Sequence, residues 1–234
     1  MNSINKDELI FPSTSLHEKV TSFMTTKLME DNKSILDQNN LVDKKHFKNL
    51  INKPIIWMQQ EHGKNALKVD SKHLDRMVLA DAIFTHQKGL VLAVLSADCL
   101  PIILSSNDGL EIAAIHAGWR GLSKGIIEST LDLFSCPLNN ISAWLAPCIS
   151  KKNFEVGSDV FKSFNNKKVH ESFSLSSSTG KWNLDLHKAA SKLLNNYDVK
   201  ILQSNLCTYA EDDLLYSYRR DKTKKRMVTV IWRD

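Results

Sequence analysis

The sequence predicts an α+β protein with mixed sheets. Apolar runs of strand length are interspersed with helix-like periodic segments, without the strict strand–helix–strand alternation of a doubly wound parallel sheet. Of the 234 residues, 42% are hydrophobic and 24% are charged, which is ordinary for a globular protein with a sizeable core. Because no internal repeat or clean linker divides the chain, we expect a single domain over residues 1–234.

The first 53 residues differ in character from the rest of the chain. They are polar and rich in Asn, Lys and Asp, and residues 20–53 show only weak apolar periodicity. We therefore expect irregular structure with one or two short helices in this part. The segment 54–234, in which strand-like runs begin, is expected to form the core.

Strands are predicted where short apolar runs lie between turn signals. Residues 89–96 form a continuous apolar run, which is typical of a strand buried on both faces. The other predicted strands are residues 54–58, 100–104, 111–115, 141–145, 199–202 and 227–232. Helical periodicity covers residues 126–134, 154–164 and 184–195, whereas residues 172–181 indicate a loop or a weak hairpin.

The net charge of +5 comes from one short segment. Residues 219–226 carry six basic side chains and one acidic one, which leaves equal numbers of both signs elsewhere. A nucleic-acid-binding protein usually has a basic face with interleaved aromatic residues, so we expect no nucleic-acid partner. The lysines at 222, 224 and 225 are expected at the solvated tip of a hairpin that leads into the last strand.

The cysteines and the first residues indicate a cytoplasmic protein. Four cysteines lie far apart without a C-x-x-C pair, so free thiols in a reducing compartment are expected. The N-terminal residues lack the apolar run of a signal peptide, and no apolar stretch has the length of a membrane span. We expect no membrane partner.

A glycine-rich corner follows the predicted strand that ends at His116. Gly118, Gly121 and Gly125 lie close together in a chain with only eight glycines. A strand, a glycine turn and a helix start together present backbone N–H groups to an anion, and Arg120 adds a planar fork suited to phosphate. The alternative is a tight turn whose glycines serve packing alone.

Three candidate metal ligands lie at predicted strand ends: His62, Cys99 and His116. One thiolate and two imidazoles can bind zinc and leave a fourth position for water or substrate. Their spacing matches no compact zinc motif, and each residue alone is more often a satisfied core or surface group. Asp98, beside Cys99, is either a residue that orients a ligand or a turn residue.

Seven short motifs together resemble the YfiH-like family, which carries the older label of multicopper polyphenol oxidase (laccase) and is now associated with purine nucleoside phosphorylase activity. They occur in the family's order from about residue 54 to the C-terminus, whereas residues 1–53 diverge from it. The motifs are QEHG at 60–63, ADA at 80–82, ADCLP at 97–101, HAGWRG at 116–121, FEVG at 154–157, CTY at 207–209 and YSYRRD at 216–221.

The resemblance implies a layered α/β/β/α sandwich similar to that of putative cysteine hydrolases. It implies one zinc ion held by His62, Cys99 and His116, which with Arg120 form the expected catalytic set. Adenosine, inosine, guanosine or methylthioadenosine would be cleaved with phosphate, and adenosine deamination is a further activity of the same pocket. A monomer or weak homo-oligomer is expected. The residues expected to bind nucleoside and phosphate are Gly118, Trp119, Arg120, Gly121, Arg219 and Arg220; the last two contact substrate or form an internal ion pair.

The older laccase label conflicts with the histidine pattern. No two of the eight histidines are two positions apart, so the His-x-His pairs of a multicopper cluster are missing. Cu²⁺ remains an alternative occupant of a single site, because it outcompetes zinc at most nitrogen and sulfur sites. Two other functions stay open: a hydrolase of peptidoglycan precursors with Cys99 as nucleophile and His116 as base, and an inactive scaffold protein.

Overall fold

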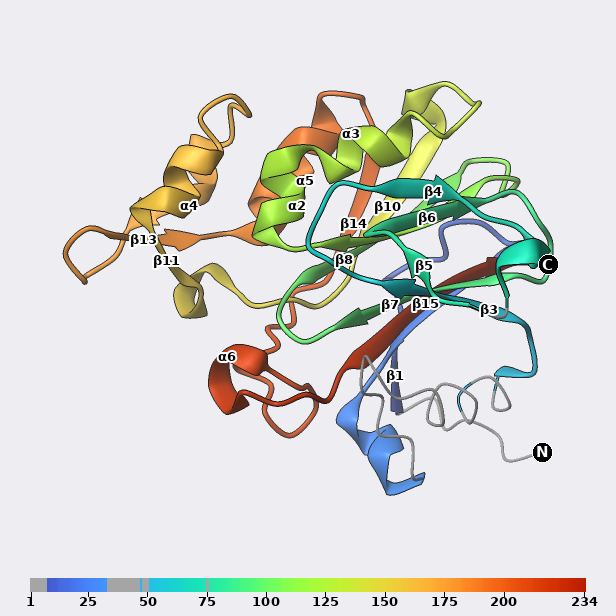
Figure 1. Ribbon diagram of the computed structural model, residues 1–234, viewed down its shortest axis with the longest axis horizontal. Coiled ribbons are helices and arrows are strands. Elements are labelled where there is room, and N and C mark those ends of the chain that lie inside the picture. The colour runs from blue at the N-terminus through green and yellow to red at the C-terminus, as the bar shows by residue number, and fades with distance from the viewer. Residues whose placement is uncertain (1–7, 33–46, 48–50, 75) are drawn as a thin grey trace.

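Two six-stranded mixed sheets stack face to face, and helices cover the outer face of one of them (Figure 1). The computed structural model describes residues 8–32, 47, 51–74 and 76–234. Among these residues, no helix has the length and apolar character needed to cross a membrane. The predicted α+β class with mixed sheets is confirmed.

The first sheet places the last strand of the chain beside strands from the N-terminal half. Its central strand β15 runs antiparallel to both of its neighbours, β2 and β7, whereas β3 pairs in parallel with β7 and β5. In spatial order the strands are β1 (Leu9–Ile10), β2 (Val20–Thr25), β15 (Met227–Arg233), β7 (Val91–Ser96), β3 (Ile55–Gln59) and β5 (Val78–Leu79).

The second sheet contains the antiparallel pair β8–β9, whose connecting turn includes the Asn-Asp-Gly sequence at residues 107–109. Its spatial order is β14 (Lys200–Gln203), β10 (Ile141–Leu145), β8 (Leu100–Ser106), β9 (Ile112–Ala117), β6 (Ala82–Thr85) and β4 (Ala66–Lys68). A separate three-stranded sheet consists of β11 (Glu155–Gly157), β13 (Lys181–Leu184) and β12 (Phe173–Leu175).

The helices are short. α2 (Trp119–Lys124), α3 (Ile126–Leu131) and α5 (Leu186–Asn195) pack on the outer face of the second sheet through the largest apolar cluster (Figure 1). The remaining helices are α4 (Ser158–Ser163), α6 (Tyr218–Asp221) and the 3₁₀ turns η2 (Lys27–Asn32), η3 (Ser71–His73), η4 (Leu138–Asn140), η5 (Lys151–Asn153) and η6 (His170–Ser172).

Strand β7 is apolar at each position from Val91 to Leu95 because both of its faces are buried. Leu92 and Val94 face the core between the two sheets, whereas Val91, Ala93 and Leu95 lie in the cluster on the outer face of the first sheet. That outer cluster also contains Met29 of η2 and Phe47. The strand is therefore buried on both faces, as predicted.

The strands expected in the core are confirmed, and the segment 172–181 forms the predicted hairpin as the pair β12–β13. The helix expected over residues 184–195 is also confirmed as α5, which begins two residues later. The helix expected over residues 126–134 is confirmed for its first six residues, as α3.

The prediction of irregular or helical structure after residue 20 is wrong for β2. This strand is mostly buried and pairs with β15. The Thr25 hydroxyl accepts a hydrogen bond from the backbone N–H of Val228 at 2.9 Å. Small Ser and Thr side chains made the segment look polar although tertiary packing buries it. Residues 33–46 and 48–50 of the same segment lie outside the described residues.

Two further local predictions are wrong. Residues 155–157 form strand β11 rather than the start of a helix, and α4 begins only at Ser158. The segment before β15 is not a hairpin, because the short helix α6 and a left-handed Lys222 (φ 54°) precede that strand. At residues 155–157, pairing with β13 outweighs the local helical periodicity. Before β15, the Ser217 side chain caps the short helix α6 in place of the expected hairpin.

Candidate metal centre

The structure brings His62, Cys99 and His116 together at one end of the two sheets. His62 follows β3, Cys99 lies in the turn between β7 and β8, and His116 is the penultimate residue of β9. Their candidate ligand atoms all lie within 4.8 Å of one another, and the two imidazole rings meet edge to face with centroids 4.7 Å apart. It is the only such group of His, Cys, Asp or Glu residues in the described part of the chain.

Asp81 organises two of these three residues from a fully buried position. Its carboxylate accepts hydrogen bonds from the backbone N–H groups of Glu61, His62 and Gly63, at 3.2, 2.9 and 2.7 Å. These three hydrogen bonds hold His62 in a left-handed backbone conformation with φ 59°. The same carboxylate bonds Nδ1 of His116 at 2.8 Å.

The Asp81 contact determines which nitrogen of His116 is available. In the neutral imidazole, a proton on Nδ1 that is donated to Asp81 leaves the lone pair of Nε2 available to a metal ion. The carboxylate that bonds the side chain of a candidate ligand directly is therefore Asp81. Sequence reasoning singled out Asp81 only as part of a motif, because 35 residues separate it from His116.

The electrostatics of the cluster favour a thiolate at Cys99. Burial alone would raise the pKa of the Cys99 thiol, but the charge and hydrogen bond of His116, followed by those of His62, lower that pKa to about 6. Burial likewise opposes ionisation of His116, yet Cys99 and Asp81 together raise its pKa to about 9. A thiolate is the form of cysteine that binds metals and acts as a nucleophile.

The glycines of the following turn are needed for close approach. A Cβ atom on Gly118 would lie 3.1 Å from Sγ of Cys99 and 3.2 Å from Cδ2 of His62. A Cβ atom on Gly121 would lie 2.9 Å from the carbonyl oxygen of Gly63. Both glycines therefore allow the start of α2 to pack directly against the cluster.

Arg120 and Trp119 lie beside the cluster at the start of α2. The exposed Arg120 guanidinium lies over the Trp119 ring, 4.4 Å from its centroid. Within the described residues, no protein acceptor bonds this guanidinium. Its donors are therefore open to an anionic ligand.

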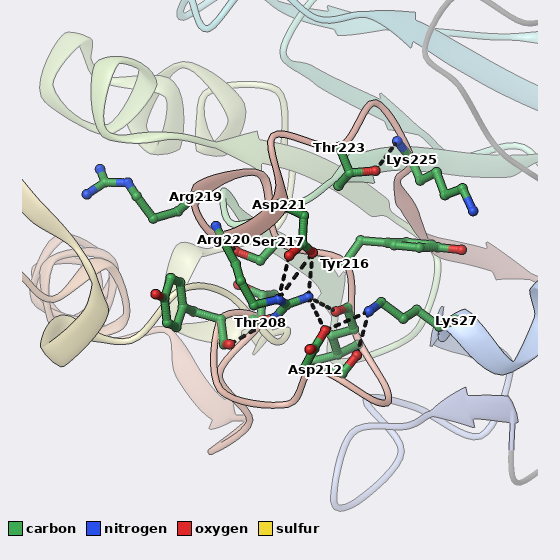
Figure 2. Close-up of polar contacts among 12 residues, drawn as sticks. Lys27, Thr208, Asp212, Tyr216, Ser217, Arg219, Arg220, Asp221, Thr223 and Lys225 are labelled. Atoms are coloured by element: carbon green, nitrogen blue, oxygen red, sulfur yellow. Dashed lines mark hydrogen bonds and ion pairs between the residues drawn. The ribbon is translucent and has the colours of Figure 1, made fainter.

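The Asp98 carboxylate bonds residues outside the cluster. Asp98 is buried and left-handed (φ 95°), and its carboxylate accepts from the Thr208 hydroxyl at 2.7 Å and from the Arg219 backbone N–H at 2.6 Å. The Arg219 guanidinium bonds the carbonyl of Glu155 at 3.0 Å and lies over the Phe154 ring. Figure 2 shows the Arg219 side chain pointing away from the polar network that surrounds its neighbour.

That neighbour, Arg220, has acceptors for all five of its N–H donors. Its side chain is 14% exposed, and Figure 2 shows it at the centre of the network. The acceptors are the carbonyls of Thr208, Tyr209 and Leu215 and the carboxylates of Asp212 and Asp221. This geometry supports the internal ion pair rather than a substrate contact.

Comparison with known proteins identifies the family. The sequence model described as "Multi-copper polyphenol oxidoreductase laccase" matches residues 16–234. A protein of Escherichia coli strain K12 named purine nucleoside phosphorylase YfiH is 40% identical over 185 residues, which is 79% of this chain and 75% of that protein. This chain belongs to the YfiH family. A Haemophilus influenzae relative named purine nucleoside phosphorylase is 35% identical over 206 residues, covering 86% of this chain and 83% of its own.

Solved structures agree with this membership of the YfiH family. A Neisseria meningitidis protein superposes with a TM-score of 0.87 at 27% identity, covering 97% of this chain and 99% of its own. A Bacillus licheniformis YfiH protein superposes over 100% of both chains with a TM-score of 0.86 at 23% identity, which shows a shared fold.

The donor set fits zinc. A tetrahedral zinc ion separates its nitrogen and sulfur ligands by roughly 3.3–3.8 Å, so ligand atoms within 4.8 Å need only small adjustments to reach it. Three protein ligands are typical of a catalytic rather than a structural zinc site. The family description names copper, for which a single cluster of this kind provides one site at most.

Proposed function

We propose that this YfiH-family protein is a zinc-dependent purine nucleoside phosphorylase. The observation that carries the proposal is the convergence of His62, Cys99 and His116 beside an exposed arginine, in a chain whose relatives are named purine nucleoside phosphorylases. In the reaction, a phosphate oxygen bonds to C1′ of the ribose while the bond from C1′ to the purine nitrogen breaks. The products are ribose 1-phosphate and the free purine.

Each group near the cluster has a part in this proposal. His62, Cys99 and His116 would hold the zinc ion, which supplies a Lewis acid when bound. Asp81 would hold the proton on Nδ1 of His116, so that Nε2, once deprotonated, is the nitrogen that binds the metal.

The turn after β9 would bind phosphate. Arg120 is exposed there and its guanidinium can form a bidentate, charge-assisted contact with an anion. Gly118 and Gly121 allow close packing of this turn against Cys99, His62 and Gly63, so an anion bound there would lie close to the metal. Trp119 offers an aromatic face next to the same arginine.

Metal analysis combined with a product assay tests the proposal. Protein purified without chelators or nickel should contain about one zinc per chain and should convert inosine to hypoxanthine only when phosphate is present. Cys99→Ala and His116→Ala should lose both the zinc and the activity, because two ligands hold the metal too weakly. Cys136→Ala is the matched control, since Cys136 lies outside the cluster.

Two outcomes would contradict the proposal. Near-full zinc occupancy in both Cys99→Ala and His116→Ala would show that these residues do not bind the zinc ion. Release of the purine base without phosphate would show that the enzyme hydrolyses the nucleoside instead of cleaving it with phosphate. Parallel assays with adenosine, guanosine and methylthioadenosine define the substrate range, and release of ammonia from adenosine tests the deaminase activity.

A second candidate is a cysteine hydrolase. It is favoured by the partly exposed Cys99 thiol, which lies among two imidazoles in an arrangement that can generate a nucleophilic thiolate. Zinc bound through Cys99 would block this chemistry. Hydrolysis of peptidoglycan precursors that requires metal-free protein, and that Cys99→Ala abolishes, would favour this candidate over phosphorolysis.

A further inference from the structure

Asp98 has a positive φ angle, which is unusual for a residue other than glycine. It lies in the turn between β7 and β8, next to Cys99, with φ 95° and only 8% of its surface exposed. A non-glycine residue in this region is strained and persists only where its surroundings hold it in place. The structure therefore has to supply interactions that compensate for this turn.

The Asp98 carboxylate supplies the compensating interactions, because both of its oxygens accept hydrogen bonds. Oδ1 accepts from the hydroxyl of Thr208 at 2.7 Å, and Oδ2 accepts from the backbone N–H of Arg219 at 2.6 Å. Thr208 is completely buried, and its own backbone N–H bonds the carbonyl of Cys148 at 3.1 Å. Contacts of this length to a carboxylate are strong hydrogen bonds.

These contacts join segments that are distant in the sequence. Thr208 is 110 residues and Arg219 is 121 residues from Asp98. Arg219 lies in α6, and the backbone carbonyl of Asp98 also accepts from the N–H of Ile149, after β10. The turn that carries Cys99 is thus tied to three other parts of the chain.

We propose that Asp98 is a positioning residue, whose carboxylate fixes the Cys99 turn to helix α6 and thereby sets the Cys99 sulfur against the two imidazoles. The inference rests on the proposed metal site. Asp98 itself does not touch the metal ligands' donor atoms; it acts through the backbone of Cys99 and through the start of α6. Its loss should therefore change metal binding in protein that is still folded.

The test separates the carboxylate from the backbone strain. Asp98→Gly removes the carboxylate and also relieves the strain at φ 95°, so this variant is expected to fold. Asp98→Asn preserves the shape of the side chain and tolerates a left-handed conformation. Thr208→Val removes one of the two donors, and Thr208→Ser restores its hydroxyl.

Arg219→Ala is the matched control for metal binding. The contact with Asp98 uses the backbone N–H of residue 219, which this variant retains. The variant removes the guanidinium alone. Its metal affinity should therefore remain within about threefold of the wild-type value.

The readouts are zinc affinity by chelator competition and the thiolate-to-cobalt charge-transfer band of the Co²⁺-substituted protein. Asp98→Gly should weaken zinc binding by at least about tenfold and should shift or weaken the charge-transfer band. Losses of this size are typical when a residue that supports a metal ligand is removed. Thr208→Ser should stay within about threefold of wild type, whereas Asp98→Asn, which keeps one acceptor oxygen for two donors, should fall between this value and that of Asp98→Gly. Thr208→Val should fall between these limits.

Unchanged affinity and spectrum in folded Asp98→Gly would overturn the inference, whatever the change in melting temperature. If that variant does not fold, the Thr208→Val and Thr208→Ser pair decides: equal metal affinities overturn the inference, and rescue by serine supports it. If the wild-type protein binds no metal, the proposed function fails. The alkylation rate of Cys99 then tests the positioning role, which an unchanged rate in Asp98→Gly or Thr208→Val would overturn.

Discussion

The turn after β9 and the C-terminal segment 219–226 both present arginines from short helices, but they use them differently. Arg120 of α2 is exposed and contacts the Trp119 ring. Arg220 of α6 is 14% exposed and has protein acceptors for every donor. A guanidinium whose donors are all engaged contributes to folding, whereas one with open donors can bind a ligand.

Figure 2 shows how far the C-terminal network extends. Asp212 receives both Arg220 at 2.9 Å and the ammonium of Lys27 at 2.9 Å, so this network ties the N-terminal η2 to α6. By contrast, the turn after β9 is fixed by glycine contacts with the cluster. A cluster of basic residues in a sequence therefore does not by itself mark a binding surface.

The largest expected effect separates the two arginines by stability. Arg220→Ala leaves three partly buried carbonyls without this donor, and it removes the charged partner of Asp221 and one of the two partners of Asp212. It should lower the free energy of unfolding by about 3 kcal/mol. Arg120→Ala should change it by less than about 0.5 kcal/mol, because the side chain is exposed. Urea denaturation measures both. Equal losses of stability in Arg220→Ala and Arg120→Ala would contradict the assignment of a folding role to Arg220 and a binding role to Arg120.

The second effect concerns phosphate. Arg120→Ala should raise the KM for phosphate by at least tenfold with a much smaller change in the KM for nucleoside, because a charge-assisted hydrogen bond contributes about 1.5–3 kcal/mol. Steady-state assays that vary each substrate in turn provide the measurement. Ser123→Ala on the same helix is the control. Phosphate dependence that matches wild type would show that the turn is only structural.

The third effect tests the close packing of the turn against the cluster. Gly118→Ala adds a Cβ atom 3.1 Å from Sγ of Cys99, so either the sulfur or the helix start has to move. Zinc affinity should fall by roughly tenfold, equivalent to about 1.4 kcal/mol. Chelator competition checks this value. A wild-type affinity would mean that the turn can shift without disturbing the metal ligands.

The smallest effect belongs to the lysines that follow α6. Lys222 and Lys224 are exposed, and Lys225 is partly exposed beside the Tyr216 ring. Neutralising all three together should leave turnover within about twofold, or roughly 0.4 kcal/mol. A larger loss of turnover in this triple variant than in Arg120→Ala would mean that segment 219–226, and not the turn after β9, matters more for activity.

Sequence reasoning found the metal-ligand candidates because they lie at the ends of strands that local apolar runs define. It did not assign the role of Asp81, whose bonds reach across 18–35 residues and have no local signal. It also could not decide between substrate contact and internal ion pair for Arg220. That choice depends on carbonyls of residues 208, 209 and 215 that converge only when the segment folds.

The sequence by itself determined the mixed α+β class, the strands β3, β7, β8, β9, β10 and β15, and the three residues of the cluster. Local periodicity and turn signals are sufficient for the class and the strands, because each depends on neighbours within a few positions. The three cluster residues were singled out by their places at strand ends and assigned as a ligand set through the resemblance to the family. Only the tertiary structure decided that β2 is a buried strand, that Asp81 orients His116, and that Asp98 joins the Cys99 turn to α6. Each of these depends on hydrogen bonds between residues far apart in the chain, which form only once the sheets have assembled.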